Sequence, residues 1–216
     1  VSSRVSVADA ESLRSADTFY PEWVSERYLP LPESITPQTI SLAEELTAAH
    51  DNPFDKSIAV RDYLRNNISY NDQIEAPPDG IDPVHYTLFV TQEGYCNYYA
   101  SAMAIMLRSQ GVPSRVVSGY AQGEYDEASK SFRVRANNAH TWVEVYFPRY
   151  GWIQFEPTAS LPLVDRPATA GGGDAFASPA LPPDLSAEDR LREELGDLRD
   201  ESLEDLLAGG ESGQSP

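Results

Sequence analysis

Hydrophobic residues recur every three or four positions in the first half of the chain, a spacing that predicts amphipathic helices. Two of these helices are expected to start after Thr36 and Asn52, because each is an N-cap residue followed by proline. A third helix is expected from about Cys96 to Gln110, where Gly111 provides the stop signal. The region before the middle of the chain is therefore expected to be helical.

The spacing changes to every second position beyond the third helix, and this alternation predicts β-strands. Val, Tyr, Phe and Trp are frequent in four such segments, 115–121, 132–135, 140–147 and 152–155. Residues 148–151 contain a turn signal that joins the last two strands as an antiparallel hairpin. Helices followed by an antiparallel meander predict an α+β fold.

Composition divides the 216 residues into three parts. Residues 1–35 are polar and then rich in Pro, Tyr and Trp, which we interpret as an extended lead-in that packs on the core. Residues 36–160 carry the periodic patterns, all three histidines and the cysteine, and are expected to form the domain itself. Residues 161–216 contain 13 acidic and 4 basic residues and a Pro/Gly-rich stretch. For them we expect a largely flexible linker and a marginal helix.

Net charge, the length of apolar runs and the cysteine count exclude several classes of protein and site. The 34 acidic residues outnumber the 16 basic ones, for a net charge of −18, whereas binding to nucleic acid or to an anionic membrane surface needs a basic footprint. No apolar run approaches the roughly 20 residues that span a bilayer. A single cysteine excludes an intrachain disulfide and a cysteine-rich zinc site. Because the chain begins with Val1, we expect it to be part of a longer protein.

The lone cysteine, Cys96, is expected at the start of the third helix. Unsatisfied backbone N–H groups and the positive end of the helix dipole favour a thiolate at that position. A thiolate is the nucleophile of cysteine enzymes. A free cysteine is also commonly a small buried hydrophobic residue, so the position alone leaves both interpretations open.

His140 begins one strand of the predicted hairpin and Glu156 ends the other, so the hairpin should bring the two residues together. A histidine beside a carboxylate supplies a general base and the group that orients it, which are two parts of a Cys-His-acid relay. Each residue also has an ordinary structural interpretation, since histidines at strand starts and solvated carboxylates at strand ends are common. The relay requires all three side chains, and each is predicted at the end of an element.

Four motifs in order along the chain are similar to those of the bacterial transglutaminase-like proteins, most closely the membrane-anchored TgpA-type proteins. The resemblance covers the chain from roughly Leu31 to Pro162. The motifs are Gly94-Tyr95-Cys96, the segment Leu107–Tyr120, Ala139-His140-Thr141-Trp142-Val143-Glu144-Val145, and Gly151-Trp152-Ile153-Gln154-Phe155-Glu156-Pro157-Thr158. The resemblance implies a papain-like, transglutaminase-like core with its nucleophile at a helix start packed on an antiparallel sheet, and makes 36–160 the catalytic domain.

The resemblance also implies roles for individual residues. Cys96 would be the nucleophile, His140 the general base and acid, and Glu156 the residue that orients the imidazole, although the family more usually has aspartate at this last position. The backbone N–H of Cys96 is one candidate oxyanion donor, and Gln92 is a weak second one because a side-chain amide upstream of the nucleophile serves papain-like enzymes. No metal ion or organic cofactor is expected.

The resemblance predicts transfer of a glutamine acyl group to a lysine amine or to water through a thioester. Two alternatives remain open: a cysteine peptidase or amidase that acts on peptide or cell-wall substrates, and a non-enzymatic peptide-binding module with a degenerate triad. In either case the partner is a protein or peptide and not nucleic acid. The TgpA-type resemblance further implies a membrane-anchored, extracytoplasmic protein, and we expect a monomer.

Overall fold

The computed structural model describes residues 5–6, 8–166 and 176–177. The chain divides into two compact units, Ser6–Phe176 and the combination of Val1–Val5 with Ala177–Pro216, and the first contains the helices and the central sheet. Most of the predicted acidic linker and the whole of its predicted marginal helix lie outside the described residues. No helix in the described part of the chain is long and apolar enough to cross a membrane.

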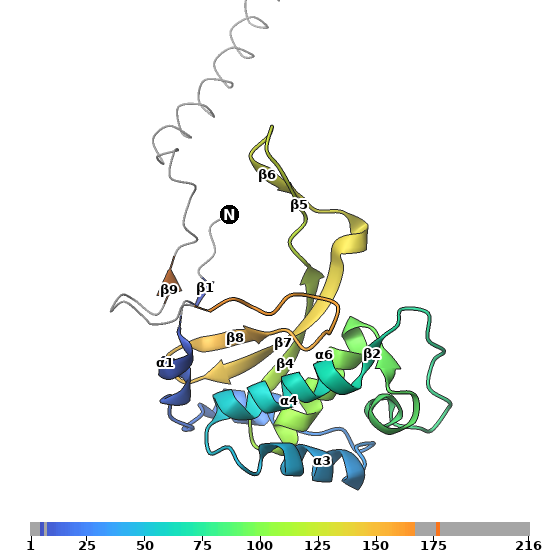
Figure 1. Cartoon of the computed structure of the whole chain (residues 1–216). Helices are drawn as coiled ribbons and strands as arrows, with labels where there is room; N and C mark the ends of the chain where they lie inside the picture. Colours follow the sequence, from blue (N-terminus) through green and yellow to red (C-terminus); the bar gives the residue numbers. More distant parts are fainter. Residues whose placement is uncertain (1–4, 7, 167–175, 178–216) are drawn as a thin grey trace, which may run out of the picture. The chain divides into compact units, whose positions relative to one another are not determined.

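All three predicted helices are present (Figure 1). They are α3 (Pro37–Thr47), α4 (Pro53–Asn67) and α6 (Cys96–Ser109). The side chains of Thr36 and Asn52 cap α3 and α4 by accepting hydrogen bonds from backbone N–H groups in the first turn, and proline follows each cap. Shorter helical segments are α5 (Pro83–His85), the π-helix η1 (Tyr86–Thr91) and the 3-10 helix η2 (Ala136–Asn138).

The lead-in contains two short helices, whereas the sequence predicts an extended segment for residues 1–35. These are α1 (Ala10–Arg14), whose N-cap Asp9 accepts a hydrogen bond from a backbone N–H, and α2 (Glu22–Tyr28). Five and seven residues are too few to show a helical period, and packing stabilises such short helices more than propensity does. Trp23 of α2 packs edge to face on Tyr146 of the sheet.

The central sheet has three antiparallel strands in the order β4-β7-β8. They are β4 (Ser114–Tyr120), β7 (Ala139–Phe147) and β8 (Gly151–Phe155), close to three of the predicted segments. The fourth predicted strand forms a separate hairpin, β5 (Glu124–Asp126) with β6 (Ser131–Arg133), which projects beyond the sheet in Figure 1. Two further strands, β1 (Val5–Ser6) and β9 (Phe176–Ala177), lie at the limits of the described chain.

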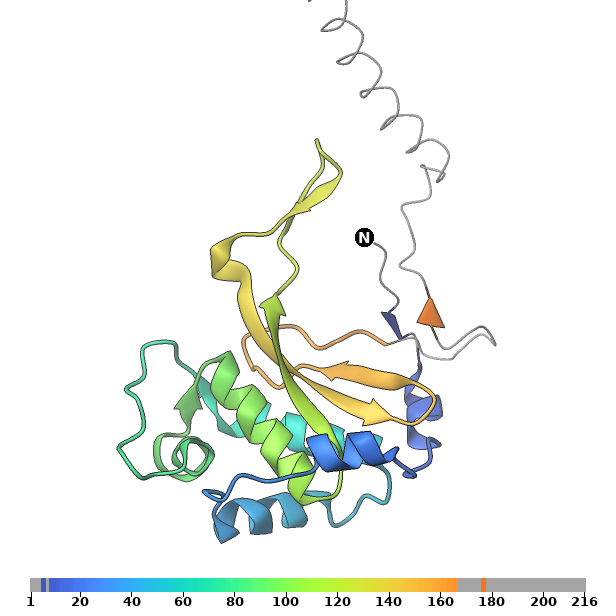
Figure 2. The same cartoon turned by 180° about the vertical axis from the view of Figure 1, so that it is seen from behind.

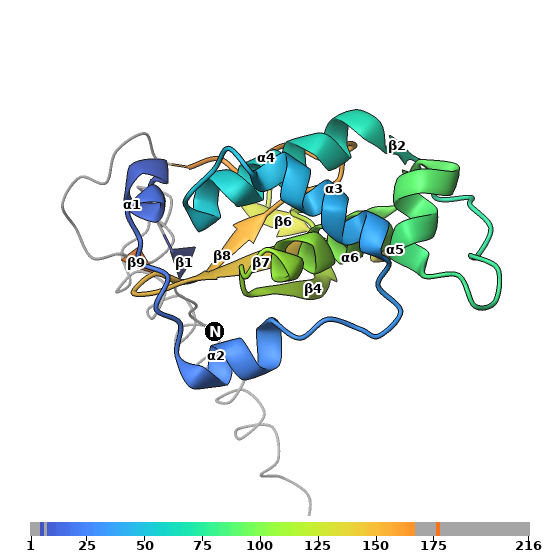
Figure 3. The same ribbon diagram turned by 90° about the horizontal axis from the view of Figure 1, so that it is seen from below.

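Helices cover both faces of the central sheet. The view from below shows α3, α4 and α6 on one side and α2 on the other (Figure 3), and the rear view shows α2 across the strands (Figure 2). Side chains alternate along β7, so that Val143, Val145 and Phe147 are fully buried in the core. The helices contribute Leu64, Tyr99, Met103 and Leu107 to the same core. This mixture of helices and an antiparallel sheet confirms the predicted α+β class.

A small parallel pair of strands positions the start of α6. Residues of β2 (Ser69–Tyr70) pair with β3 (Glu93–Gly94), and backbone hydrogen bonds on either side of the pair extend the contact. Gly94 is required here, because a Cβ atom at this position would lie 2.8 Å from Cβ of Tyr98. The pair thus holds the segment after β2 beside the first turn of α6.

Candidate active site

Cys96 is the first residue of α6, as the sequence predicts, and its side chain is partly exposed. Tyr95 is the N-cap residue and forms no side-chain capping hydrogen bond. The N–H groups of Tyr98 and Tyr99 donate hydrogen bonds to the carbonyl oxygen of Tyr95, whereas those of Cys96 and Asn97 are the first of the helix, where no intrahelical acceptor precedes them. Cys96 thus lies at the positive end of the α6 dipole.

His140 and Glu156 form a buried hydrogen-bonded pair. Nε2 of His140 lies 2.6 Å from Oε2 of Glu156, and the two residues are only 9% and 4% exposed. Oε1 of Glu156 accepts a second hydrogen bond, 2.8 Å long, from the backbone N–H of Thr158. Both carboxyl oxygens are therefore engaged, so the carboxyl group has a fixed orientation toward the imidazole.

The sheet register explains how this pair forms. Val143 of β7 lies opposite Phe155 of β8, so continuing the antiparallel pairing by one residue sets Glu156 against Trp142. Glu156 therefore reaches His140 diagonally, a separation that a longer side chain can bridge. The hairpin predicted from residues 148–151 does bring the two side chains together, with an offset of two positions along β7.

Arg65 of α4 holds the segment that carries Glu156. Its guanidinium donates hydrogen bonds to the backbone carbonyl oxygens of Glu156, Thr158 and Leu161. One planar guanidinium thereby supplies hydrogen-bond donors to three backbone carbonyls of the segment that follows β8, where no neighbouring strand in the described part of the chain supplies them. No local sequence pattern identifies Arg65, because an arginine on a helix face cannot be distinguished from a solvated charge by its neighbours in the sequence.

Cys96 and His140 line the same cleft, which we call the Cys96 cleft. Its volume is about 510 Å³, and it is lined by Tyr70, Asp72, Tyr95, Cys96, Asn97, Ser118, Gly119, Ala139, His140 and Thr141. The hydroxyl of Thr141 donates a 2.7 Å hydrogen bond to the side-chain carbonyl of Asn97. Since Asn97 follows Cys96 and Thr141 follows His140, this bond fixes the helix start against the strand start.

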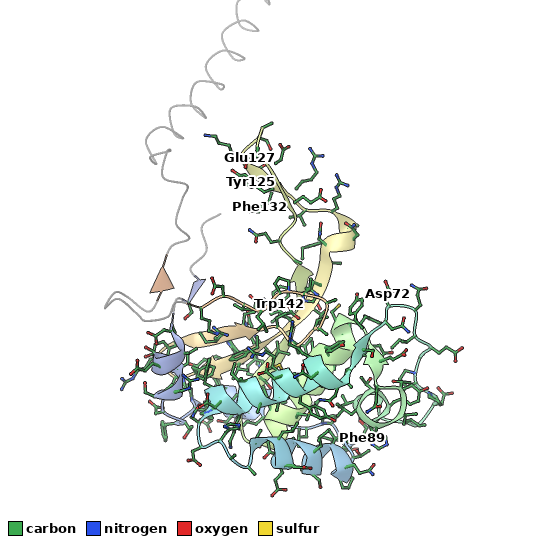
Figure 4. All side chains as sticks on the ribbon, in the orientation of Figure 1. Asp72, Phe89, Tyr125, Glu127, Phe132 and Trp142 are labelled. Atoms are coloured by element: carbon green, nitrogen blue, oxygen red, sulfur yellow. The ribbon has the colours of Figure 1, made fainter. Side chains whose placement is uncertain are left out.

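A second cavity, of about 560 Å³, lies against His140 and is also lined by Trp142 and Glu156. The Trp142 ring is stacked with the imidazole at a centroid distance of 6.1 Å and an interplanar angle of 22° (Trp142 is labelled in Figure 4). Gly119 lies opposite His140 in the sheet, and a Cβ atom there would lie 2.8 Å from the Trp142 ring. The glycine therefore leaves room for the indole beside the imidazole.

Tyr70 and Asp72 are cleft residues that the sequence analysis did not identify. Burial, followed by the nearby Cys96 and Asp72 side chains, raises the pKa of the Tyr70 hydroxyl, because each negative charge opposes a phenolate. Their position depends on the pairing of β2 with β3, two strands too short to show a periodic signal. No sequence pattern would have placed them in the same cleft as Cys96.

Gln92 is not among the residues that line the Cys96 cleft. Its side chain is exposed, its backbone is left-handed with φ of 51°, and its carbonyl oxygen accepts a hydrogen bond from Ser69 in the β2 region. The structure therefore brings Cys96, His140 and Glu156 to one site but not Gln92. Within the described residues, no group of three or more His, Cys, Asp or Glu side chains is arranged to hold a metal ion.

Comparison with known proteins identifies relatives of this domain. The model of the transglutaminase-like superfamily matches residues 40–157. The uncharacterized protein YebA of Bacillus subtilis is 48% identical over 140 residues, which are 62% of this chain and 19% of YebA. A protein-glutamine gamma-glutamyltransferase of Pseudomonas aeruginosa is 39% identical over 132 residues, which are 61% of this chain and 20% of that protein. The chain thus spans about a fifth of the length of these curated relatives.

The crystal structure of the periplasmic domain of TgpA from Pseudomonas aeruginosa is similar to this fold. The TM-score is 0.57 at 34% sequence identity, with 65% of this chain and 48% of that chain covered. These matches confirm the resemblance derived from the four sequence motifs, including its TgpA-type character.

Proposed function

Because the chain belongs to the transglutaminase-like superfamily, we propose that it catalyses cysteine-dependent acyl transfer on protein or peptide amides. The observation that carries this proposal is the arrangement of the site. A cysteine at a helix N-terminus shares a cleft with a histidine, and that histidine is hydrogen-bonded at 2.6 Å to a buried glutamate. Nucleophile, base and orienting acid are the three parts that acyl transfer through a thioester requires.

The hydrogen bond to Glu156 supports a separate proposed role for each ring nitrogen of His140. Nε2 lies 2.6 Å from Oε2 of Glu156, and in this proposal it donates its proton to the carboxylate. Nδ1 is then left as the basic nitrogen for exchange with the Cys96 thiol. In this proposal Glu156 acts as a positioning residue, since it fixes the imidazole orientation and stabilises the imidazolium that forms.

The proposed reaction has two steps. The Cys96 thiolate attacks the carbonyl carbon of a glutamine carboxamide, and the imidazolium of His140 protonates the departing ammonia, which leaves a thioester. An amine or a water molecule then attacks the thioester, gives a proton to His140 and releases the Cys96 thiolate. The backbone N–H of Cys96, at the helix start, is our candidate donor to the oxyanion in both steps.

Three parallel assays test the proposal: amine incorporation into a glutamine peptide, ammonia release and peptide cleavage. We expect amine incorporation or ammonia release by the wild-type chain and their loss in Cys96→Ala. Iodoacetamide labelling at neutral pH reports directly on this thiol, because Cys96 is the only cysteine in the sequence. Peptide cleavage alone would favour a peptidase. An unreactive thiol with no activity in any assay would favour a peptide-binding module.

We also propose that the full-length protein is membrane-anchored and presents this domain outside the cytoplasm. The similarity to a solved periplasmic domain supports this location. The test is labelling of intact cells that express the full-length protein with a membrane-impermeant maleimide, compared with its Cys96→Ala variant. Labelling of Cys96 only after lysis would contradict the proposed location.

A further inference from the structure

The Cys96 cleft contains one carboxylate besides the proposed catalytic residues. Among its lining residues, Asp72 is the only Asp, Glu, Lys or Arg. Apart from the proposed catalytic Cys96 and His140, the other lining residues are aromatic, small or uncharged polar ones, such as Tyr70 and Ser118. A substrate group that enters the cleft therefore meets one carboxylate among its lining residues besides the proposed catalytic groups.

Backbone pairing fixes the position of Asp72 relative to the nucleophile. Tyr70 of β2 pairs in parallel with Gly94 of β3. Asp72 lies two residues after Tyr70, and Cys96 lies two residues after Gly94. Between these points the N–H of Asn71 donates a 2.9 Å hydrogen bond to the carbonyl of Gly94. The Asn71 side chain donates another, 2.8 Å long, to the Glu93 carboxylate.

The charge of Asp72 has no cationic partner in the described part of the chain. Asp72 forms no ion pair with a basic side chain there, and its hydrogen-bond partner is the neutral side-chain amide of Gln73. Asp72 is exposed, on the segment that follows β2 (Figure 4). A carboxylate that has no cationic partner, is exposed and lines the same cleft as Cys96 is available to bind a cationic group of a substrate.

We propose that Asp72 is a specificity-determining residue that binds the acyl acceptor as a primary ammonium, so that lysine side chains and similar alkylamines are preferred acceptors. The proposal rests on the thioester chemistry proposed above and extends it to the choice of acceptor. Amide nitrogens and hydroxyls are uncharged and gain nothing from Asp72, whereas an alkylammonium gains an electrostatic interaction. Asp72 thus favours aminolysis of the thioester over hydrolysis.

The protons and bonds of the acceptor step can be accounted for with the amine, the thioester and His140. The bound ammonium first releases one proton to solvent, because only the neutral amine has a free electron pair. Its nitrogen then forms a bond to the thioester carbon, the carbon–sulfur bond breaks, and the second proton passes to His140. The products are an isopeptide, the Cys96 thiolate, the His140 imidazolium and one proton in solution.

Competing acceptors of different charge test this inference. Nα-acetyl-lysine amide is protonated at neutral pH, whereas hydroxylamine is neutral there and traps the same thioester as a hydroxamate. We expect Asp72→Asn to raise the ratio of the apparent KM for the lysine compound to that for hydroxylamine by about three- to tenfold. Asp72→Lys should raise this ratio further. The matched control is Glu75→Gln, which removes a charge from the same exposed segment outside the cleft lining and should leave the ratio unchanged.

Salt provides a measurement that does not depend on the folding of a variant. In the wild-type protein, added NaCl should raise the KM for the lysine compound and leave that for hydroxylamine constant, since salt screens exposed charges. A lysine KM that is insensitive both to salt and to Asp72→Asn, with hydroxamate still formed, would overturn the role of Asp72. Absence of hydroxamate in every protein would instead overturn the proposed thioester chemistry.

Discussion

The two oxygens of the Glu156 carboxyl group have different partners. Oε2 bonds to His140, and Oε1 accepts from the N–H of Thr158. Glu156→Gln can keep the bond to Thr158 through its amide oxygen, but it presents a neutral group to the imidazole. We expect this variant to fold and to lose about 10²- to 10⁴-fold in kcat, measured as hydroxamate formation.

Glu156→Asp tests the length of the same side chain. It keeps the charge and is the more usual residue of the family, but it is one carbon–carbon bond, about 1.5 Å, shorter. Because Glu156 reaches His140 diagonally across the sheet, we expect the aspartate to be less active than wild type and more active than Glu156→Gln. An aspartate variant with full activity would show that the segment after β8 adjusts to the shorter side chain.

The three residues that the sequence analysis selected share one property, since each lies at the end of an element with a clear local pattern. Cys96 begins α6, His140 is the second residue of β7, and Glu156 directly follows β8. Asp72 and Arg65 could not be selected in the same way. The position of Asp72 depends on the pairing of β2 with β3, and that of Arg65 on where the chain runs after β8, which are both tertiary contacts.

Helix α4 and the segment after β8 act together through Arg65. Its three hydrogen bonds to carbonyl oxygens of that segment hold the backbone of Glu156 in place. We expect Arg65→Ala to lower the free energy of unfolding by about 2–4 kcal/mol, because hydrogen bonds to a charged donor contribute more than neutral ones. Urea denaturation followed by tryptophan fluorescence measures this loss.

The effect of Arg65 on activity separates positioning from stability. We expect Arg65→Lys to recover part of the stability but little of the kcat, because an ammonium cannot reproduce the planar fork of donors. Both variants should be assayed well below their unfolding transitions. Wild-type kcat in Arg65→Ala would show that Glu156 keeps its orientation through the Thr158 bond alone.

The same contrast between local and tertiary signals holds for whole elements. The N-caps and periodicity of α3 and α4 and the alternation of β7 are local, and the sequence predicted them. The lead-in helices α1 and α2 were missed because they are too short to show a period. Their placement depends on contacts such as that of Tyr28 with Trp152, whose ring centroids are 4.6 Å apart.

The lead-in has a role in the molecule as a whole, because α2 covers the outer face of the sheet and α1 packs on α4. Trp23 and Tyr28 of α2 pack on Tyr146 and Trp152 there, and the Arg115 guanidinium lies 4.2 Å from the Trp152 ring centroid. The other face is covered by α3, α4 and α6 (Figure 3). We therefore propose that residues of the lead-in unfold together with the core and not before it.

Alkaline pH tests that cooperativity through Tyr20, which lies between α1 and α2. Its hydroxyl is buried without a hydrogen-bond partner among the described residues. Burial, and then the nearby Asp17, raise the pKa of Tyr20 to about 12. In the unfolded chain a tyrosine loses its proton near pH 10, so between about pH 10 and 12 the folded state binds more protons. Stability should therefore fall as the pH rises through this range.

Tyr20→Phe removes this titration together with a buried unpaired hydroxyl. We expect the variant to be at least as stable as wild type at pH 8 and to lose less stability between pH 9 and 11, measured by urea denaturation. Part of the loss of stability with rising pH should remain in this variant, because burial also raises the pKa of Tyr99 to about 12. Tyr125→Phe, on the exposed β5–β6 hairpin, is the matched control and should follow wild type. If Tyr20→Phe also follows wild type above pH 10, then Tyr20 is solvated in the folded protein, and the lead-in opens before the core unfolds.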